Sequence, residues 1–121
     1  MPDLQLTVRL EVDGAAAPGF PLVRRLTVPV LQPFNPVARG GVPEFKTLPV
    51  EEISNLQLLA VRPDRDVTLR VCGQTSSGIR VKAGGLALFF NSGMCQPPTR
   101  NALVRNEAAT AAHVQGVGGG L

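Results

Sequence analysis

Three strand patterns follow one another in the middle of the chain, with turn residues between them. Residues 56–61 form a short apolar run, residues 67–72 alternate Val, Leu and Val with Thr, Arg and Cys, and a third alternation covers residues 79–83. Short patterns at this close spacing are typical of strands in an all-β domain. Pro63 and Asp64 lie between the first two patterns and favour a tight turn. We therefore predict that these two strands form a hairpin.

The composition also argues against a helical fold. The 121 residues include 13 Gly and 11 Pro, and a proline inside a helix costs about 3 kcal/mol. Hydrophobic residues make up 44% of the chain, but there is no Trp, no Tyr and only five Phe, so Val, Leu and Ala must build the core. The length suits one core and one domain. We predict a single all-β domain over residues 1–121.

The N-terminal region contains the strictest alternation in the chain. In residues 4–12, Leu and Val occupy one face, and Gln, Thr, Arg and Glu occupy the other. This pattern predicts a half-buried strand. A second alternation spans residues 20–30, where Arg24 interrupts the apolar face and suggests a bulge or bend. Pro29 cannot donate a ladder hydrogen bond, which indicates an edge strand or the end of a strand.

The C-terminal region offers three further strand candidates. These are residues 86–91, 102–105 and 112–117, and residues 118–120 are three glycines that we expect to form a flexible end. Together with the other patterns they give about eight short strands. That number and spacing predict a β-sandwich or jelly roll.

Residues 32–49 differ in composition from the rest of the chain. Four prolines and the pair Gly40 and Gly41 are spread through this segment, which predicts an extended arm or long loop. Loops of this length are usually functional or form interfaces. Exposure of its apolar side chains to water would be unfavourable, so we expect them to dock on this subunit or on a neighbouring one. The predicted contact residues are Phe34, Val37, Arg39, Val42 and Phe45.

The residues that could carry catalysis do not form a recognisable site. His113 is the only histidine, and no serine lies in a nucleophile-elbow pattern. Cys72 and Cys95 lack the CxxC spacing of a zinc or redox motif. We expect two buried thiols, with a single bridge between them as the alternative. The sequence therefore predicts a protein that is not an enzyme, with no catalytic residue and no cofactor.

Two carboxylates in one turn need a separate explanation. Asp64 and Asp66 could bind Ca²⁺ with loop carbonyls, but Arg62 and Arg65 lie beside them and supply the opposite charge. We expect an ion-pair cluster among these four residues and no metal site.

Charge and hydropathy limit the partners. The net charge is +3, and the basic residues are scattered without interleaved aromatic residues, so we expect no direct binding of nucleic acid. No segment approaches the ~18 apolar residues of a membrane span, and the N-terminus lacks a leader pattern. These features predict a soluble protein that is made in the cytoplasm and has no membrane contact.

The Ser- and Thr-containing loop at residues 75–78 could contact a sugar, although Trp and Tyr, the usual stacking platforms, are absent.

The second half of the chain resembles the small β-sandwich structural proteins of tailed bacteriophages. The segments that carry this resemblance are LLAVRPDRDVTLRVCG, IRVKAGGLALFFNSG and NALVRNEAATAAHVQGVGGG. In such proteins a strand, a charged turn, a VTLRV strand, an apolar and basic strand ending in Gly-Gly and a final strand of small residues occur in this order. The resemblance covers residues 56–120 and does not extend to the proline-rich segment.

This resemblance implies a virion component that is made in the host cytoplasm. It would be a head decoration or cement protein, or a tail-associated protein, and it would have no active site. Its partners would be other virion structural proteins and further copies of itself, because a small-residue core of this size gains stability from burial between subunits. The alternative is a β-sandwich module that binds a glycan or receptor.

Overall fold

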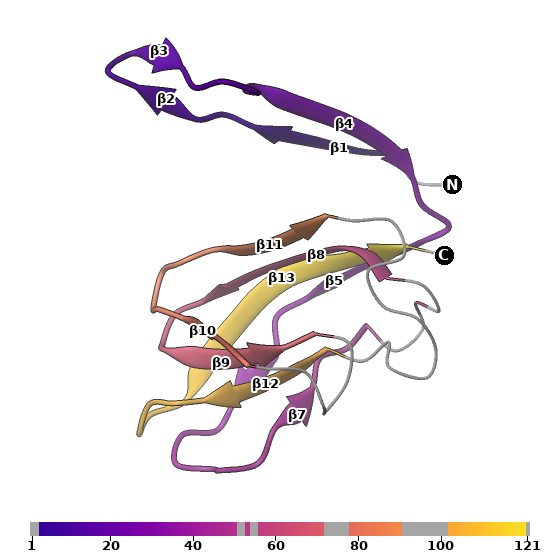
Figure 1. The fold of residues 1–121 in the computed structure, drawn as a ribbon. Helices are drawn as coiled ribbons and strands as arrows, with labels where there is room; N and C mark the ends of the chain where they lie inside the picture. Colours follow the sequence, from indigo (N-terminus) through magenta and orange to yellow (C-terminus); the bar gives the residue numbers. More distant parts are fainter. Residues whose placement is uncertain (1–2, 51–52, 54–55, 72–77, 91–101, 121) are drawn as a thin grey trace.

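The structure, a computed structural model, describes residues 3–50, 53, 56–71, 78–90 and 102–120. These residues form thirteen strands and no helix (Figure 1). The predicted all-β class is therefore confirmed, with antiparallel sheets of four and five strands in a sandwich-like arrangement. Within the described ranges, no helix is long and apolar enough to cross a membrane.

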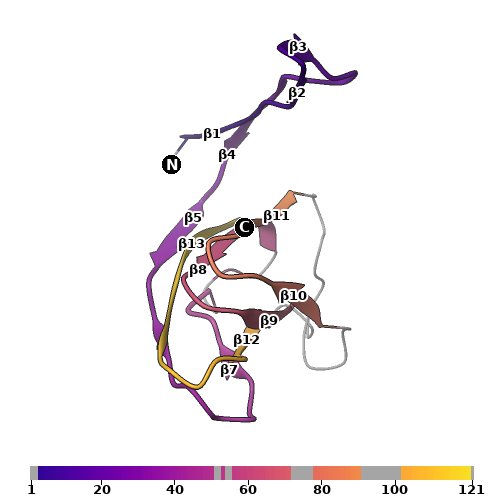
Figure 2. The same cartoon turned by 90° about the vertical axis from the view of Figure 1, so that its left-hand side faces the viewer.

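Residues 3–27 form a long hairpin outside the sandwich, which we call the projecting hairpin. Its strands are β1 (Asp3–Val8), β2 (Glu11–Val12), β3 (Ala15–Ala16) and β4 (Leu22–Thr27), with β1 paired to β4 and β2 to β3. Asp13 and Gly14 make the turn at its tip with φ angles of 53° and 81°, and the pair Asp-Gly is favoured in turns that require positive φ. In both views the hairpin extends away from the remaining strands (Figures 1 and 2).

The remaining described strands form two antiparallel sheets. The five-stranded sheet has the order β11 (Ala87–Phe90), β8 (Leu56–Pro63), β13 (Ala112–Gly120) and β5 (Val30–Phe34), with β6 (Val37–Ala38) also paired to β13. The four-stranded sheet has the order β10 (Ile79–Val81), β9 (Val67–Arg70), β12 (Leu103–Asn106) and β7 (Lys46–Thr47).

The core lies between these two sheets. Leu59, Val61 and Val114 of the five-stranded sheet are fully buried, as are Val67 and Leu69 of the four-stranded sheet. Leu48, Val50 and Ile53 also belong to this core. Aliphatic side chains thus provide most of the buried surface, as the absence of Trp and Tyr requires.

The predicted hairpin around Pro63 and Asp64 is wrong. β8 pairs with β11 and β13, whereas β9 pairs with β10 and β12, so the turn carries the chain from one sheet to the other. The backbone of this turn bonds to two other segments: the N–H of Asp64 donates to the carbonyl of His113, and the N–H of Glu107 donates to the carbonyl of Asp66. The two strands thus lie in different sheets, whose inner faces pack against each other to form the core.

The proline-rich segment also differs from its prediction as an extended arm or long loop. Residues 32–49 contain the end of β5, all of β6 and all of β7, and each of these strands pairs with the sandwich. Pro33 is accommodated because β5 is an edge strand of its sheet. The element that projects is the N-terminal hairpin.

The glycines at residues 118–120 were expected to form a flexible end, and this expectation is wrong. They belong to β13, which lies between β5 and β8. A Cβ atom at Gly118 would lie 2.6 Å from Cγ1 of Val50 and 3.3 Å from Cδ1 of Ile53. Glycine is therefore needed here for close packing of the core.

Candidate interaction surfaces

One side of the projecting hairpin is apolar except for an arginine at its middle. Direct cross-strand partners lie on the same side of an antiparallel pair, and the register places Leu6 opposite Arg24 and Val8 opposite Leu22. Leu4, Leu6 and Val8 therefore share one side, where they are partly exposed. The exposed Arg24 lies on this side as well. We call Leu4, Leu6, Val8, Leu22 and Arg24 the hairpin face. Toward the tip, Leu10 and Val12 are 51% and 62% exposed.

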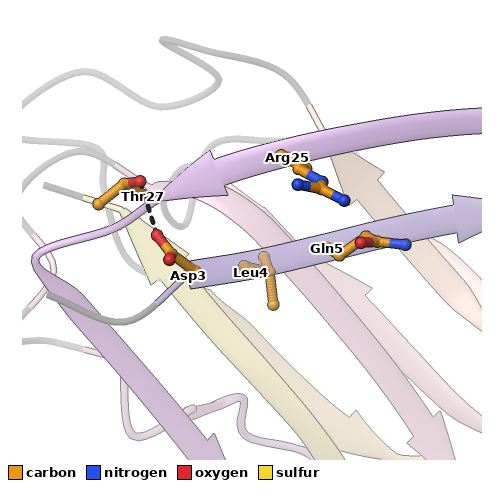
Figure 3. A pocket seen from close by; sticks show the side chains of 5 residues that line it. All are labelled: Asp3, Leu4, Gln5, Arg25 and Thr27. Atoms are coloured by element: carbon orange, nitrogen blue, oxygen red, sulfur yellow. Dashed lines mark hydrogen bonds between the residues drawn. The ribbon is translucent and has the colours of Figure 1, made fainter.

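The opposite side of the hairpin is polar near its base. Gln5 lies opposite Arg25, and Asp3 lies opposite Thr27. The Thr27 hydroxyl donates to Oδ1 of Asp3 over 2.9 Å and joins the two strands where they leave the sandwich (Figure 3). These residues and Leu4 line a hollow of about 450 Å³. Figure 3 shows the Leu4 side chain directed away from Gln5 and Arg25.

A second apolar surface covers part of the side of the five-stranded sheet that faces away from the four-stranded sheet, beside a row that holds the exposed Arg62 and Gln115. The register aligns two rows across this sheet, which we call the outer face: Leu88, Ala60, Val117 and Pro33 in one row, and Phe90, Leu58, Gly119 and Leu31 in the next. No position in either row carries a charge. Leu58 and Gly119 are already buried within the single chain, whereas Leu88 and Pro33 are exposed. The exposed side of an antiparallel sheet is normally polar, so these exposed apolar residues indicate a surface that becomes covered.

The corresponding side of the four-stranded sheet has the opposite character. The register aligns Arg80, Thr68 and Arg105 in one row across β10, β9 and β12. The guanidinium carbons of Arg70 and Arg105 lie 4.0 and 4.7 Å from the ring centroid of Phe45, which is within cation–π range. This sheet therefore has the usual polar exterior, unlike the two apolar rows of the five-stranded sheet.

Glu107 balances part of this positive charge. Its Oε1 accepts a hydrogen bond from Nε of Arg105 over 2.6 Å and another from the Thr68 hydroxyl over 2.8 Å. The bond from Arg105, followed by that from Thr68, holds the pKa of the Glu107 carboxyl below its usual range. The cluster is an internally paired part of the sheet surface.

The predicted contact residues differ in burial and in surroundings. Phe34 is 7% exposed and belongs to the core, so it docks on its own subunit. Val37 is 52% exposed, and Arg39 is also exposed. Val42 and Phe45 are partly buried, and both lie near Arg105: Val42 lines a hollow of about 290 Å³ with Arg105, and Phe45 lies against the Arg105 guanidinium.

The carboxylates of the turn after β8 do not form the predicted cluster with Arg62 and Arg65. Asp64 Oδ1 accepts from the N–H of His113 over 2.8 Å, and Asp66 Oδ1 accepts from the N–H of Ala83 over 2.9 Å. Asp66 pairs with Lys82 over 3.4 Å. The Ala83 hydrogen bond, with help from Lys82, lowers the pKa of Asp66. Among the described residues, no group of three or more His, Cys, Asp or Glu side chains could hold a metal ion.

His113 lines a surface hollow, and all four serines of the chain lie outside the described residues. This hollow measures about 470 Å³, and its lining residues are Arg62, Pro63, Asp64, Gly84, His113 and Gln115. Cys72, Cys95 and most of the loop at 75–78 lie outside the described residues. The expected buried thiols and their possible bridge therefore stay predictions.

Sequence reasoning missed both apolar surfaces, although the sequence carried a signal for one of them. LQLLAV in β8 and ALFF in β11 are nearly continuous apolar runs, which are typical of strands covered on both faces. For the hairpin face the alternation was visible, but alternation does not indicate what covers the apolar side.

No protein-family model, curated protein or solved structure matches the chain.

Proposed function

We propose that this protein is a non-enzymatic structural component of a phage virion. It would bind capsid subunits as a decoration or cement protein, or form part of the tail. The observation that carries the proposal is the projecting hairpin, whose hairpin face is apolar apart from Arg24. A hairpin of two strands is at best marginally stable in water when it is isolated, so this element is suited to binding a neighbouring protein.

Two further observations support an assembly role. The outer face of the five-stranded sheet is a second apolar surface, and Leu88 within it is 36% exposed. The segments within residues 56–120 resemble phage β-sandwich structural proteins in the order and character of their strands. The proposed location is therefore the virion, with other virion proteins and further copies of this chain as partners.

The deciding experiment is quantitative mass spectrometry of purified particles of the virus that encodes the chain, combined with antibody labelling in electron microscopy. Hundreds of copies per particle would indicate the shell, and multiples of three or six along one axis would indicate the tail. Absence of the protein from purified particles would overturn the proposal.

A second candidate function is binding of a glycan or receptor. The hollow beside β8 and β13 favours it, because Arg62, Asp64 and Gln115 can exchange hydrogen bonds with sugar hydroxyls. Selective binding to a glycan array that is lost in Gln115→Ala would support this candidate. Gln115 is exposed, so this substitution should not disturb the fold.

A further inference from the structure

We propose that the projecting hairpin joins the same hairpin of a second copy edge to edge, with the two β1 strands paired antiparallel. The joined hairpins then form one continuous sheet in the order β4, β1, β1 and β4. This inference rests on the proposed assembly function and names one partner of the projecting hairpin. The contact uses the free backbone edge of β1 and the side chains along it.

The outer edge of β1 is unpaired. β1 pairs with β4 and with no other strand of the described ranges, so a row of its backbone N–H and C=O groups faces away from the hairpin. Such an edge is a template for a further strand. A two-stranded hairpin is marginally stable in water, whereas three or more strands with an apolar side can form a stable sheet. A strand added at this edge therefore stabilises the hairpin.

The edge of β4 has a different character. Arg24 and Arg25 are adjacent and exposed at its middle, and Nη1 of Arg24 donates to the Val23 carbonyl of the same strand over 3.1 Å. Charged side chains on an edge strand oppose the addition of another strand. Antiparallel pairing of two β4 strands about their centre would also set one of these arginines opposite its own copy. In β1 the only charged residue is Asp3 at its start, so the edge of β1 is the one open to a partner.

The chain from Asp3 to Arg9 is self-complementary in one antiparallel register. Every opposed pair in this register is matched in chemistry: apolar with apolar, amide with hydroxyl, and acid with base. The pairs are Leu6 with Leu6, Leu4 with Val8, Gln5 with Thr7, and Asp3 with Arg9. Directly opposed side chains share one side of a sheet, so the apolar residues of both copies lie on one side and the polar residues on the other.

Asp3 and Arg9 select this orientation and register. Both are exposed, and neither belongs to an ion pair of the described residues. They lie about 20 Å apart along an extended chain, so they cannot meet within one copy. In-register parallel strands would set like charges side by side, which is destabilising. An antiparallel shift by two residues toward the tip would set Asp3 opposite Glu11, and the opposite shift would separate Asp3 from Arg9. The complementary charges therefore fit a second copy in this one register.

Arg24 also fits this arrangement. It lies opposite Leu6 on the hairpin face, but it belongs to β4, which is the outermost strand on either side of the joined hairpins. Its guanidinium therefore stays at the rim in contact with water, and the contact buries no unpaired charge. The same strand serves in both copies, so the interface is isologous and a two-fold axis passes beside Leu6.

The test reverses the charges at the two ends of this contact in the full-length protein. Asp3→Arg sets two arginines opposite each other at both ends, and Arg9→Asp sets two aspartates opposite each other. The double variant Asp3→Arg/Arg9→Asp restores an opposite pair at both ends. Arg25→Asp, on β4 and opposite the neutral Gln5, is the matched control for the reversal of an arginine.

Sedimentation velocity over a concentration series gives the dissociation constant of the dimer, and circular dichroism checks the fold of each variant. We expect the wild type and Arg25→Asp to dimerise with the same affinity. Each single reversal should raise the dissociation constant about tenfold or more, because two attractive pairs become repulsive. The double variant should return close to the wild-type value. Asp3→Arg also removes the hydrogen bond from Thr27, and because the double variant lacks this bond as well, its recovery excludes a damaged hairpin base as the cause.

Three results would overturn the inference. A wild type that stays monomeric up to its solubility limit would mean that no second copy occupies the edge of β1. Single reversals that associate as strongly as the wild type would place the self-contact on other residues. A double variant as weak as the single ones would show that Asp3 and Arg9 do not face each other. Each of these results is compatible with presence in virions, whereas absence from purified virions would refute the proposed function even if the double variant recovers.

Discussion

Asn106 joins β6 to the loop of residues 108–110 and is the one buried polar residue of the described part of the chain. Its Nδ2 donates to the carbonyls of Ala38 and Thr110 over 3.0 and 2.7 Å, and its Oδ1 accepts from the N–H of Ala108 over 2.9 Å. Asn106→Ala would remove all of these bonds, and a buried group left without a partner costs about 1–3 kcal/mol. We expect a loss of about 3 kcal/mol in the free energy of unfolding, measured by urea denaturation.

The exposed Asn35 provides the control for this substitution. Asn35→Ala should change the free energy of unfolding by no more than about 0.5 kcal/mol, as is usual for surface positions. Equal stability of the two variants would show that the Asn106 hydrogen bonds contribute nothing to folding.

Glu107 should make stability depend on pH in the acid range. Its pKa is lowered in the folded protein, chiefly by Arg105 and then by Thr68. A group with a lowered pKa stabilises the fold above its unfolded pKa, and this contribution is lost as the pH falls through the folded pKa. Glu107→Gln should therefore be less stable than the wild type at pH 7, and the difference should shrink below about pH 4.3, the usual pKa of a glutamate.

Urea denaturation of both proteins from pH 7 to pH 2.5 measures this difference. Glu11→Gln, at the exposed tip of the projecting hairpin, is the control and should follow the wild type throughout. A difference between Glu107→Gln and the wild type that stays constant down to pH 2.5 would argue against the lowered pKa.

At the scale of the element, the glycines of β13 should differ sharply in their tolerance of a side chain. A Cβ atom at Gly116 would clash with the carbonyl oxygen of Ala60 and lie 2.6 Å from the Phe34 ring. At Gly119 the nearest atom, Cδ1 of Leu31, would be 3.4 Å away, which is ordinary contact. We expect Gly116→Ala to destabilise the protein by about 2 kcal/mol or more, as overpacking does, and Gly119→Ala to be nearly neutral. Thermal denaturation of both variants checks this, and equal melting temperatures would contradict it.

Strands were easier to predict from this sequence than their partners. The alternation in residues 4–12 correctly indicated extended structure, because successive side chains of a strand point to opposite sides. It did not indicate that β1 pairs only with β4, because periodicity describes one strand and pairing depends on contacts distant in sequence. Pro63 and Asp64 likewise indicated a turn, but not that the turn passes between sheets. In residues 32–49 the prolines suggested a loop, whereas edge positions such as that of Pro33 allow proline within a strand.

The candidate surfaces could be predicted only in part for the same reason. The continuous apolar runs in β8 and β11 are visible in the sequence, but their assembly into an outer face depends on the register with β13 and β5. Of the predicted contact residues, Phe34 is a core residue because its strand turns that side chain toward Gly116. An apolar residue in a proline-rich segment can serve the core or an interface, and the sequence does not distinguish between them.

At the scale of the whole molecule, the sandwich and the projecting hairpin should differ in stability. Long-range pairing secures β8 and β13 on both sides, whereas β1 and β4 pair only with each other. Local opening costs least where few buried contacts must be broken. We therefore expect backbone amides of the projecting hairpin to exchange with deuterium at least tenfold faster than those of β8 and β13 in dilute protein.

The dependence of hairpin amide exchange on protein concentration then distinguishes the intrinsic stability of the hairpin from stabilisation by a partner. Packing on a second copy adds buried contacts to β1 and β4 and stabilises them by mass action, so their exchange should slow as the concentration rises. Exchange in the interior of β13 should stay constant. Amides of β1 that are as well protected as those of β8 in the most dilute sample would show that the hairpin is stable without a partner. The hairpin would then have no need of the second copy to become ordered.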